Sequence, residues 1–469
     1  MKRFSILLFV AIFILHFTAL PQNNKRFAGS WAGKLDVGAM KLRLGLNFKD
    51  TTGMLVATLD SPDQGAYGIA TDKTTVVADA IKVELSTLRA SYEGAMLPGD
   101  SLIEGKWIQG GKSYDLLLHR AEKQVKLKRP QEPVPPYPYK VEEVSFTNKK
   151  TGIELAGTLT IPQGDGPFHA VVLITGSGPQ NRDEEIMGHK PFLVIADYLS
   201  RNGIAVLRYD DRGVGQSKGN FSRATSFDFA DDAEAAFEFL EKHELIDKKH
   251  TGLAGHSEGG LIAPIIASRN KDVDFIILLA GTGVAGEQIL LAQSALIMEA
   301  GGSTQKEIEE TRNVNNEIYR TIKQEPDSAK AMKLMVRAVE NYINADTSIK
   351  ASEKENRIKE NTAGLSYMTT PWMRAFLVLD PQQYLVKVKC PLLDLNGSND
   401  LQVPCEMNQQ AIEKAMKAGK NKDYKIVKLD GLNHLFQHSK TGSPVEYSTI
   451  EETFAPEALL VIKDWILRK

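Results

Sequence analysis

Short runs of alternating apolar and polar residues fill the stretch between about residues 28 and 120. KLRLGLNF (41–48), ASYEGAML (90–97) and SLIEGKWI (101–108) are examples, and turn residues separate the runs. An alternation with a period of two is typical of a strand that buries one face. The stretch predicts about eight antiparallel strands. We expect them to close into a small up-and-down barrel over residues 22–122, because closure removes unpaired sheet edges. The barrel shows no cluster of polar or aromatic residues, which favours a packing or dimerisation module over a ligand-binding barrel.

Residues 123–140 carry charges and then five prolines, without apolar periodicity. Proline favours extended polyproline geometry, so we expect a semi-rigid linker here. A second domain is expected over residues 141–469.

This second domain has a different apolar pattern. Runs such as HAVVLIT (169–175), IAVLRYD (204–210) and DFIILLAG (274–281) are almost unbroken and alternate with helical segments. Such a pattern is typical of a parallel sheet covered by helices on both faces. Between about residues 286 and 368 the periodicity is helical throughout, which predicts a helical cap. The predicted fold class is α/β, with a mostly parallel sheet flanked by helices, a helical cap and a preceding all-β, barrel-like domain.

A nucleophile motif lies in LAGHSEGG (253–260), where Ser257 is flanked by Gly255 and Gly259. The segment follows a predicted strand and opens a predicted helix. A serine at such a sharp strand-to-helix turn needs neighbours without Cβ atoms, so that strand and helix can approach each other. We therefore expect Ser257 to be a catalytic nucleophile.

A serine hydroxyl needs a neighbouring base to accept its proton. In proteins with this turn the chain order is serine, acid, histidine, and of nine histidines only His434 and His438 follow Ser257. His434 comes directly after the predicted strand YKIVKLD (424–430) and is the preferred base. His256 is interpreted as a packing or hydrogen-bonding residue of the turn.

The acid is expected at the end of an earlier strand. Asp400 lies in the loop after PLLDLNG (391–397), in position to orient His434. Asp394 lies inside that strand, where its carboxylate would need a buried partner. Glu406, at the start of the next helix, is a weaker candidate.

An acyl-transfer reaction also needs two N–H groups for the oxyanion. One is expected to be the amide of Glu258, the residue after the nucleophile. The other is expected in the glycine loop after HAVVLIT, from Ser177 or alternatively from Gly178.

Further residues have a structural and a functional interpretation. A salt-bridged network that stiffens loops is favoured over substrate contact for Arg182, Asp183, Asp211 and Arg212, and Ser217 is interpreted as a turn or cap residue. In the cap, helix packing and an acyl pocket remain open for four methionines, Met298, Met332, Met335 and Met368. Trp372 and Arg374 lie just past the cap and are candidates for the pocket mouth.

Composition narrows the choice of partners. The chain has 57 Lys and Arg against 59 Asp and Glu, with a formal net charge of −2. This balance lacks the basic surface typical of nucleic-acid binding, so nucleic acid is not an expected partner.

The first residues predict export. Lys2 and Arg3 precede an uncharged apolar run that ends at Leu15, and small residues follow at Thr18 and Ala19. This order is typical of a secretory signal, expected over residues 1–20. A transmembrane anchor would need about 20 apolar residues, more than the run provides. We expect a periplasmic or secreted protein with no stable membrane anchor after signal removal.

Export would permit a disulfide between the two cysteines, Cys390 and Cys405. The strand-like segment between them carries the chain about 20 Å, whereas disulfide Cα atoms lie within about 7 Å of each other. Free thiols are therefore expected.

Five motifs together resemble those of bacterial α/β-hydrolase carboxylesterases of the serine-aminopeptidase-like group, including the esterase D type. They are GSGPQNRDE (176–184), YDDRGVGQS (209–217), GHSEGG (255–260), LNGSNDLQVP (395–404) and GLNHLFQ (431–437). The resemblance covers about residues 141–469, and the amino-terminal strands resemble a β-domain that some members carry. Asp394 and Cys405 depart from the family pattern. The resemblance implies an α/β-hydrolase fold and hydrolysis of small-molecule esters through an acyl-enzyme, with no cofactor and no metal.

The expected function is thus that of a serine carboxylesterase. An aminopeptidase or thioesterase on the same scaffold is the alternative, and a non-catalytic binding protein is less favoured because the triad is whole. A peptidase needs an anionic anchor in the cap, but a solvated role is expected for its acidic residues, Glu307, Glu309, Glu310 and Glu317. The sequence carries no signal for the oligomeric state.

Overall fold

The structure is a computed structural model that describes residues 24–36, 41–51, 54–62, 66–121 and 128–468. The chain forms two compact units, residues 1–126 and 127–469. The predicted signal at residues 1–20 lies outside the described residues. Among the residues that are described, no helix is long and apolar enough to cross a membrane.

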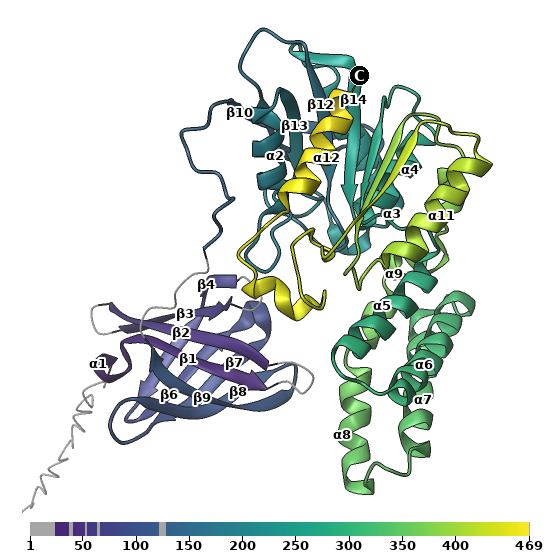
Figure 1. Cartoon of the computed structure of the whole chain (residues 1–469). Helices are drawn as coiled ribbons and strands as arrows, with labels where there is room; N and C mark the ends of the chain where they lie inside the picture. The colour runs from purple at the N-terminus through teal and green to yellow at the C-terminus, as the bar shows by residue number, and fades with distance from the viewer. Residues whose placement is uncertain (1–23, 37–40, 52–53, 63–65, 122–127, 469) are drawn as a thin grey trace, which may run out of the picture. The chain divides into compact units, whose positions relative to one another are not determined.

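The amino-terminal unit is a nine-stranded antiparallel sheet (Figure 1). Along the sheet the order is β4-β3-β2-β1-β9-β8-β7-β6-β5, so the first and last strands pair at its centre. A short helix, α1 (Asn24–Phe27), precedes the strands, which are β1 (Gly29–Asp36), β2 (Lys41–Thr51), β3 (Met54–Ser61), β4 (Ala66–Ala70), β5 (Lys73–Val77), β6 (Ala80–Leu85), β7 (Ala90–Met96), β8 (Leu102–Gln109) and β9 (Lys112–Ala121).

Two details of this sheet differ from the prediction. The segment AYGIA forms an additional strand, β4, outside the predicted alternating runs; Gly68 at its centre, with a φ of 66°, weakens the pattern. In the described part of the chain no ladder joins β4 to β5, so the sheet curls around its core of Trp31, Leu46, Tyr92 and Ile103 without closing into a barrel. A register shift between Leu59 and Ser61 interrupts the pairing of β3 with β4 at this open edge.

The second unit is built on an eight-stranded sheet with the order β10-β11-β13-β12-β14-β15-β16-β17. The pairings β10–β11 and β11–β13 are antiparallel. The remaining pairings, from β13–β12 to β16–β17, are all parallel. The strands are β10 (Lys140–Asn148), β11 (Ile153–Ile161), β12 (Phe168–Ile174), β13 (Ile204–Tyr209), β14 (Ile246–His256), β15 (Ile276–Leu279), β16 (Leu392–Gly397) and β17 (Tyr424–Leu429).

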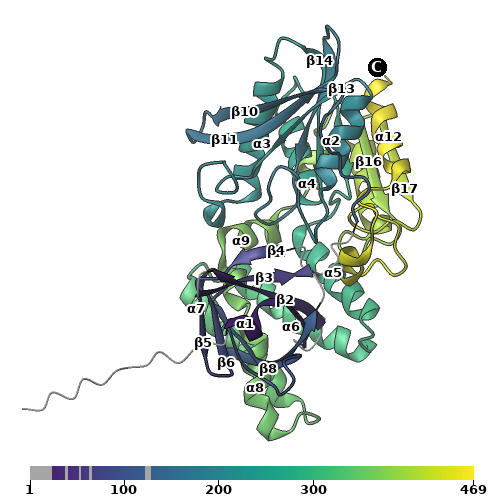
Figure 2. The same cartoon turned by 90° about the vertical axis from the view of Figure 1, so that its left-hand side faces the viewer.

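Helices cover both faces of this sheet, as Figures 1 and 2 show. One hydrophobic core joins the sheet to α3 (Ser226–Leu240), α4 (Glu258–Ala267) and α11 (Cys405–Ala418). A second core joins the other face to α2 (Pro191–Arg201) and α12 (Pro456–Leu467). The predicted α/β fold with a preceding all-β domain is confirmed.

Between β15 and β16 the chain forms a helical subdomain with its own hydrophobic core, which contains Ile318, Tyr319 and Met335. Its elements are α5 (Gly286–Ala300), α6 (Gln305–Gln324), α7 (Ser328–Ala345), α8 (Ala351–Thr362) and the 3-10 turn η4 (Leu365–Thr369). Helix α9 (Pro371–Val378) then leads back to the sheet. This subdomain occupies the region predicted as a cap. Cys390 and Cys405 are not joined by a disulfide, as expected.

Candidate active site

Ser257 stands alone between β14 and α4 in a strained backbone conformation. Its φ of 53° and ψ of −112° lie in a region that residues with a Cβ rarely adopt. Flanking glycines make the turn possible: a Cβ on Gly255 would come within 2.0 Å of Gly259 O, and one on Gly259 within 2.2 Å of Ile174 O. The expected strand-to-helix turn is therefore present, with Ser257 half-buried at its tip.

The three predicted triad residues lie at the same edge of the sheet. Ser257 follows β14, Asp400 follows β16 and His434 follows β17, and these strands are parallel. Nδ1 of His434 is 2.8 Å from Oδ2 of Asp400. The other carboxylate oxygen of Asp400 accepts hydrogen bonds from the backbone N–H groups of Gln402 and Val403, at 2.8 and 2.9 Å. The carboxyl group of Asp400 is thus held through both of its oxygens.

A neighbour of the serine contacts the loop that carries the base. The rings of His256 and His434 are 4.7 Å apart between centroids, and Nε2 of His256 is 2.9 Å from the backbone carbonyl oxygen of His434. The other side of Ser257 meets the glycine loop, since a Cβ on Gly176 would lie 3.3 Å from the Cβ of Ser257. The base loop and the glycine loop therefore meet at the nucleophile turn.

Glu184 completes this arrangement, and the sequence reasoning missed it. Its Oε1 accepts a hydrogen bond from the N–H of Gly176 at 2.6 Å and lies 2.9 Å from Nδ1 of His256. Both ring nitrogens of His256 face oxygen acceptors, an arrangement that favours the doubly protonated, cationic ring. Burial is the largest single influence and opposes this charge, but Glu184, the carbonyl of His434 and the charge of Asp400 together outweigh it, so the pKa of His256 is raised. Only its place in the GSGPQNRDE motif distinguished Glu184 from its neighbours.

The predicted oxyanion donors lie in two segments next to Ser257, the first turn of α4 and the glycine loop. Glu258 is the first residue of α4, where backbone N–H groups have no partner within the helix. Ser177 is exposed in the glycine loop, and Gly178 has a φ of 99° that lets the loop turn there. Glu258 thus directly follows Ser257 in the chain, and Ser177 belongs to the loop whose Gly176 lies next to Ser257.

The side chain of Asp211 forms hydrogen bonds at both ends of the glycine loop. Its carboxyl group accepts hydrogen bonds from Oγ1 of Thr175 at 2.8 Å and from the N–H of Gln180 at 2.9 Å. Burial raises the pKa of Asp211 to about 8, against the lowering effect of these hydrogen bonds, and the charges of Glu258 and Glu184 act in the same direction as burial. The loop is therefore anchored at both ends.

The arginines near this loop form the predicted salt-bridged network. Arg182 pairs with Asp210 at 2.8 Å, and Arg212 pairs with the buried Asp232 at 2.6 Å. Asp183 pairs with Arg208, a residue that the sequence analysis did not select. The network interpretation is thus confirmed for Arg182, Asp183 and Arg212.

Ser217 forms hydrogen bonds at the end of the turn in the motif YDDRGVGQS (209–217). Its hydroxyl donates to the carbonyl of Asp210 at 2.7 Å and accepts from the N–H of Ala156 at 2.9 Å. It therefore acts as a turn residue, as expected.

The rival triad candidates have other partners. His438 is exposed and lies 2.9 Å from Glu452 and 3.0 Å from Glu457. Asp394 is buried inside β16 and accepts a hydrogen bond from Gln409, and burial raises its pKa to about 7. Glu406 pairs with Lys428 at the surface.

Most of the residues selected in and just past the cap have packing roles, and one of them contacts the turn at Ser257. Met335 is fully buried in the core of the helical subdomain, and Met332 and Met368 pack against it, whereas Met298 is half-buried on α5. Arg374 donates hydrogen bonds to the carbonyls of Ile322 and Glu325 at the end of α6, at 2.8 and 2.9 Å, a structural role. Trp372 instead reaches the turn, because its Nε1 donates to the carboxyl group of Glu258 at 2.8 Å.

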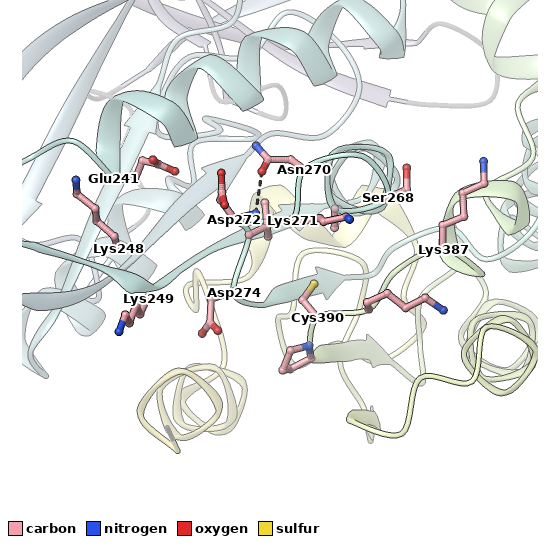
Figure 3. A pocket seen from close by; sticks show the side chains of 14 residues that line it. Glu241, Lys248, Lys249, Ser268, Asn270, Lys271, Asp272, Asp274, Lys387 and Cys390 are labelled. Atoms are coloured by element: carbon pink, nitrogen blue, oxygen red, sulfur yellow. Dashed lines mark hydrogen bonds between the residues drawn. The ribbon is translucent and has the colours of Figure 1, made fainter.

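A hollow of about 800 Å³ lies elsewhere on the same unit (Figure 3). Its lining includes Lys248, Asp274 and Cys390, which precede or begin the parallel strands, so it opens at the edge of the sheet opposite to Ser257. Lys248 and Lys387 lie at opposite ends of it in Figure 3 and do not converge on one point. Within the described ranges, no group of three or more His, Cys, Asp or Glu residues is arranged to hold a metal ion.

Comparisons with known proteins give the family context. Residues 190–438, more than half of the chain, match the family described as serine aminopeptidase, S33. The chain is 29% identical over 309 residues to esterase EstD of Thermotoga maritima, and the match covers 66% of this chain and 64% of that protein. The match thus spans less than two thirds of the relative's length.

Solved structures give weaker similarities. The esterase Pf2001 of Pyrococcus furiosus superposes with a TM-score of 0.42 at 16% identity, over 74% of this chain and 99% of that one. Est1E of Butyrivibrio proteoclasticus, solved with ferulic acid, superposes with a TM-score of 0.39 at 18% identity, over 70% of this chain and 100% of that one.

Proposed function

Because this chain belongs to the serine aminopeptidase S33 family, we propose that it is a serine hydrolase that cleaves small carboxylic esters through an acyl-enzyme. The observation that carries the proposal is the hydrogen bond of 2.8 Å between His434 and Asp400 at the sheet edge where Ser257 occupies its strained turn. A serine, a histidine and a buried carboxylate in this order form the machinery of acyl transfer.

In the proposed reaction, Oγ of Ser257 attacks the ester carbonyl carbon while Nε2 of His434 takes the hydroxyl proton. The N–H groups of Glu258 and Ser177 stabilise the oxyanion of the tetrahedral intermediate. Collapse breaks the bond to the alcohol oxygen, which receives the proton from His434. Water then attacks the acyl-enzyme with His434 as base, the acid leaves and the Ser257 hydroxyl is restored. Asp400 holds the ring and stabilises its cationic form.

Two observations favour an ester over a peptide substrate. The relative from Thermotoga maritima is an esterase by name. In the cap, the acidic residues that would be needed to anchor a substrate ammonium group are engaged locally: Glu307 caps α6 through Thr304, and Glu310 accepts a hydrogen bond from Tyr342. An aminopeptidase or thioesterase on this scaffold is the alternative.

Hydrolysis of p-nitrophenyl esters of graded acyl length, beside a panel of aminoacyl anilides, tests the proposal. Ser257→Ala is expected to abolish ester turnover, whereas Ser268→Ala, at the other end of α4, is the matched control and keeps it. Anilide turnover that exceeds ester turnover would identify a peptidase. Ester turnover that survives in Ser257→Ala would contradict the proposed mechanism.

We also propose that the protein is exported, to the periplasm or the medium, on the signal-like composition of residues 1–20. Fractionation of expressing cells, with amino-terminal sequencing of the product, tests this. A mature protein that starts near residue 21 outside the cytoplasm is expected, and a cytoplasmic product that retains Met1 would contradict it.

A further inference from the structure

The side chain of Glu258 is buried directly behind the nucleophile turn. Only 3% of the residue is exposed. Its Oε1 accepts two hydrogen bonds, at 2.6 Å from Oγ of Ser226 and at 2.8 Å from Nε1 of Trp372. A buried carboxyl group on the residue that supplies the proposed oxyanion N–H is not required by acyl transfer, which uses only the backbone of that residue.

The two donors come from different parts of the fold. Ser226 is the first residue of α3, which packs in the core that joins the sheet to α3, α4 and α11, here called the main core. Trp372 lies on α9, the helix that leads out of the cap. Helix α9 joins two cores: Met373 and Leu377 are buried in the cap core, and Phe376 is buried in the main core. Figure 1 shows α9 at the junction between the cap helices and the sheet.

Helix α9 is also fixed in its own orientation. The indole of Trp372 stacks on Phe376, with centroids 4.9 Å apart and planes at 12°. On the cap side, Arg374 donates to two carbonyls at the end of α6. Helix α9 therefore connects the cap helices to Trp372, and the indole N–H connects Trp372 to the carboxyl group of Glu258.

We propose that Trp372 and the Glu258 side chain are positioning residues that couple the cap to the oxyanion hole, so that the cap sets the orientation of the Glu258 N–H toward the reacting carbonyl. The inference rests on the proposed function, because it takes that N–H as an oxyanion donor. Oxyanion stabilisation depends on donors held at hydrogen-bond distance from the developing charge, so a small rotation of the first turn of α4 is enough to weaken it.

The surroundings of the carboxyl group are consistent with this role. Asp211 and Tyr367 are its titratable neighbours: burial is the main cause that raises their pKa values, and the charge of Glu258 acts in the same direction, whereas Ser226 and Trp372 are neutral donors. Burial raises the pKa of Glu258 itself, against the effect of both donors. The amide oxygen of glutamine at this position would also accept the Trp372 hydrogen bond, whereas leucine has no acceptor.

The test compares three single variants in the full-length protein. Trp372→Phe removes the indole N–H and keeps an aromatic ring on Phe376. Glu258→Gln keeps an acceptor, and Glu258→Leu removes it. We expect Trp372→Phe and Glu258→Leu to lower kcat about tenfold with little change in KM, less than the 10²–10³ lost when a donor is removed outright. Glu258→Gln is expected to keep most of the activity, and Trp372→Phe is expected to add little to Glu258→Leu in the double variant.

Trp465→Phe on α12 is the matched control, because it also removes a buried indole N–H, and that group has no hydrogen-bond partner among the residues that the structure describes. A second readout is the inhibition constant of an aryl trifluoromethyl ketone, which forms a tetrahedral adduct with a serine. The constant is expected to rise about tenfold in Trp372→Phe, in step with kcat. A loss confined to KM, an equal loss in Trp465→Phe, or additive effects in the double variant would each overturn the coupling.

Failure of the proposed function would look different. If the wild-type protein hydrolyses no ester, then that function is contradicted, and the rate at which a fluorophosphonate labels Ser257 becomes the readout for the same variants. Equal labelling rates in wild type and Trp372→Phe would overturn the coupling on its own, whereas a labelling rate about tenfold slower would support it.

Discussion

His256 and Glu184 form a buried ion pair behind the nucleophile turn, with Nδ1 and Oε1 2.9 Å apart. Through its other ring nitrogen His256 contacts the carbonyl of His434, and through its other hydrogen bond Glu184 holds the N–H of Gly176. The pair therefore ties together three segments that are distant in the sequence: the glycine loop, the turn at Ser257 and the base loop. His256 and Glu184 thus hold these three segments in place relative to one another.

Replacement of His256 by glutamine is expected to lower both stability and activity. Glutamine cannot supply two ring donors or a positive charge, so the Glu184 carboxylate is left buried without a counter-charge, which costs about 3–5 kcal/mol. Urea unfolding and kcat/KM measure the two effects. His438→Gln is the matched control, because His438 is exposed and its loss is expected to change stability by less than about 0.5 kcal/mol. Equal unfolding midpoints for wild type and His256→Gln would refute a stabilising pair.

Two aspartate-to-asparagine variants distinguish the proposed triad acid, Asp400, from the other candidate, Asp394 in β16. Asp400→Asn is expected to lower kcat by about 10⁴, because the amide cannot hold His434 in the required tautomer. Asp394→Asn is expected to leave kcat unchanged, since asparagine still accepts the hydrogen bond of Gln409. Ester assays at saturating substrate measure the kcat of both variants and of the wild type. Loss of activity in Asp394→Asn alone would reassign the acid.

The buried carboxyl group of Asp211 predicts a pH-dependent contribution to stability. Its pKa is about 8 in the folded protein against 3.8 for an exposed aspartate, so between these values the folded state binds a proton that the unfolded state has released. The contribution is complete below about pH 4 and is lost as pH rises toward about 8. The Tm of wild type is expected to fall from pH 5 to pH 8 relative to that of Asp211→Asn, measured by calorimetry. A constant difference across this range would argue against a buried, protonated Asp211.

Two glycine-to-alanine exchanges test the packing of the nucleophile turn. In Gly259→Ala the new Cβ would meet the carbonyl oxygen of Ile174 at 2.2 Å, which neither segment can relieve without moving. We expect destabilisation of at least about 3 kcal/mol. Gly364→Ala, where a Cβ has open space and φ is negative, is expected to change stability by less than about 0.5 kcal/mol. Denaturant titrations of both variants measure this, and similar midpoints would show that the turn tolerates a side chain.

Local pattern and chain order predict the residues at the ends of the parallel strands. The glycines beside Ser257 are explained by the turn itself, and His434 and Asp400 were selected because the carboxyl ends of parallel strands meet at one edge of the sheet. The alternation of strands and helices in the second domain likewise follows from apolar periodicity, which is a local property.

Contacts across the fold were decided only by the tertiary structure. Glu184 and His256 are 72 positions apart, and Trp372 and Glu258 are 114 positions apart. No local pattern encodes such pairs, because they depend on which strands are neighbours and on how the cap returns to the sheet. The open edge between β4 and β5 has the same origin: alternation determines which face of a strand is buried, whereas closure depends on the curvature and register that the strands reach together. The sequence by itself thus determined the chemistry at the strand ends, and the three-dimensional packing decided which side chains hold that chemistry in place.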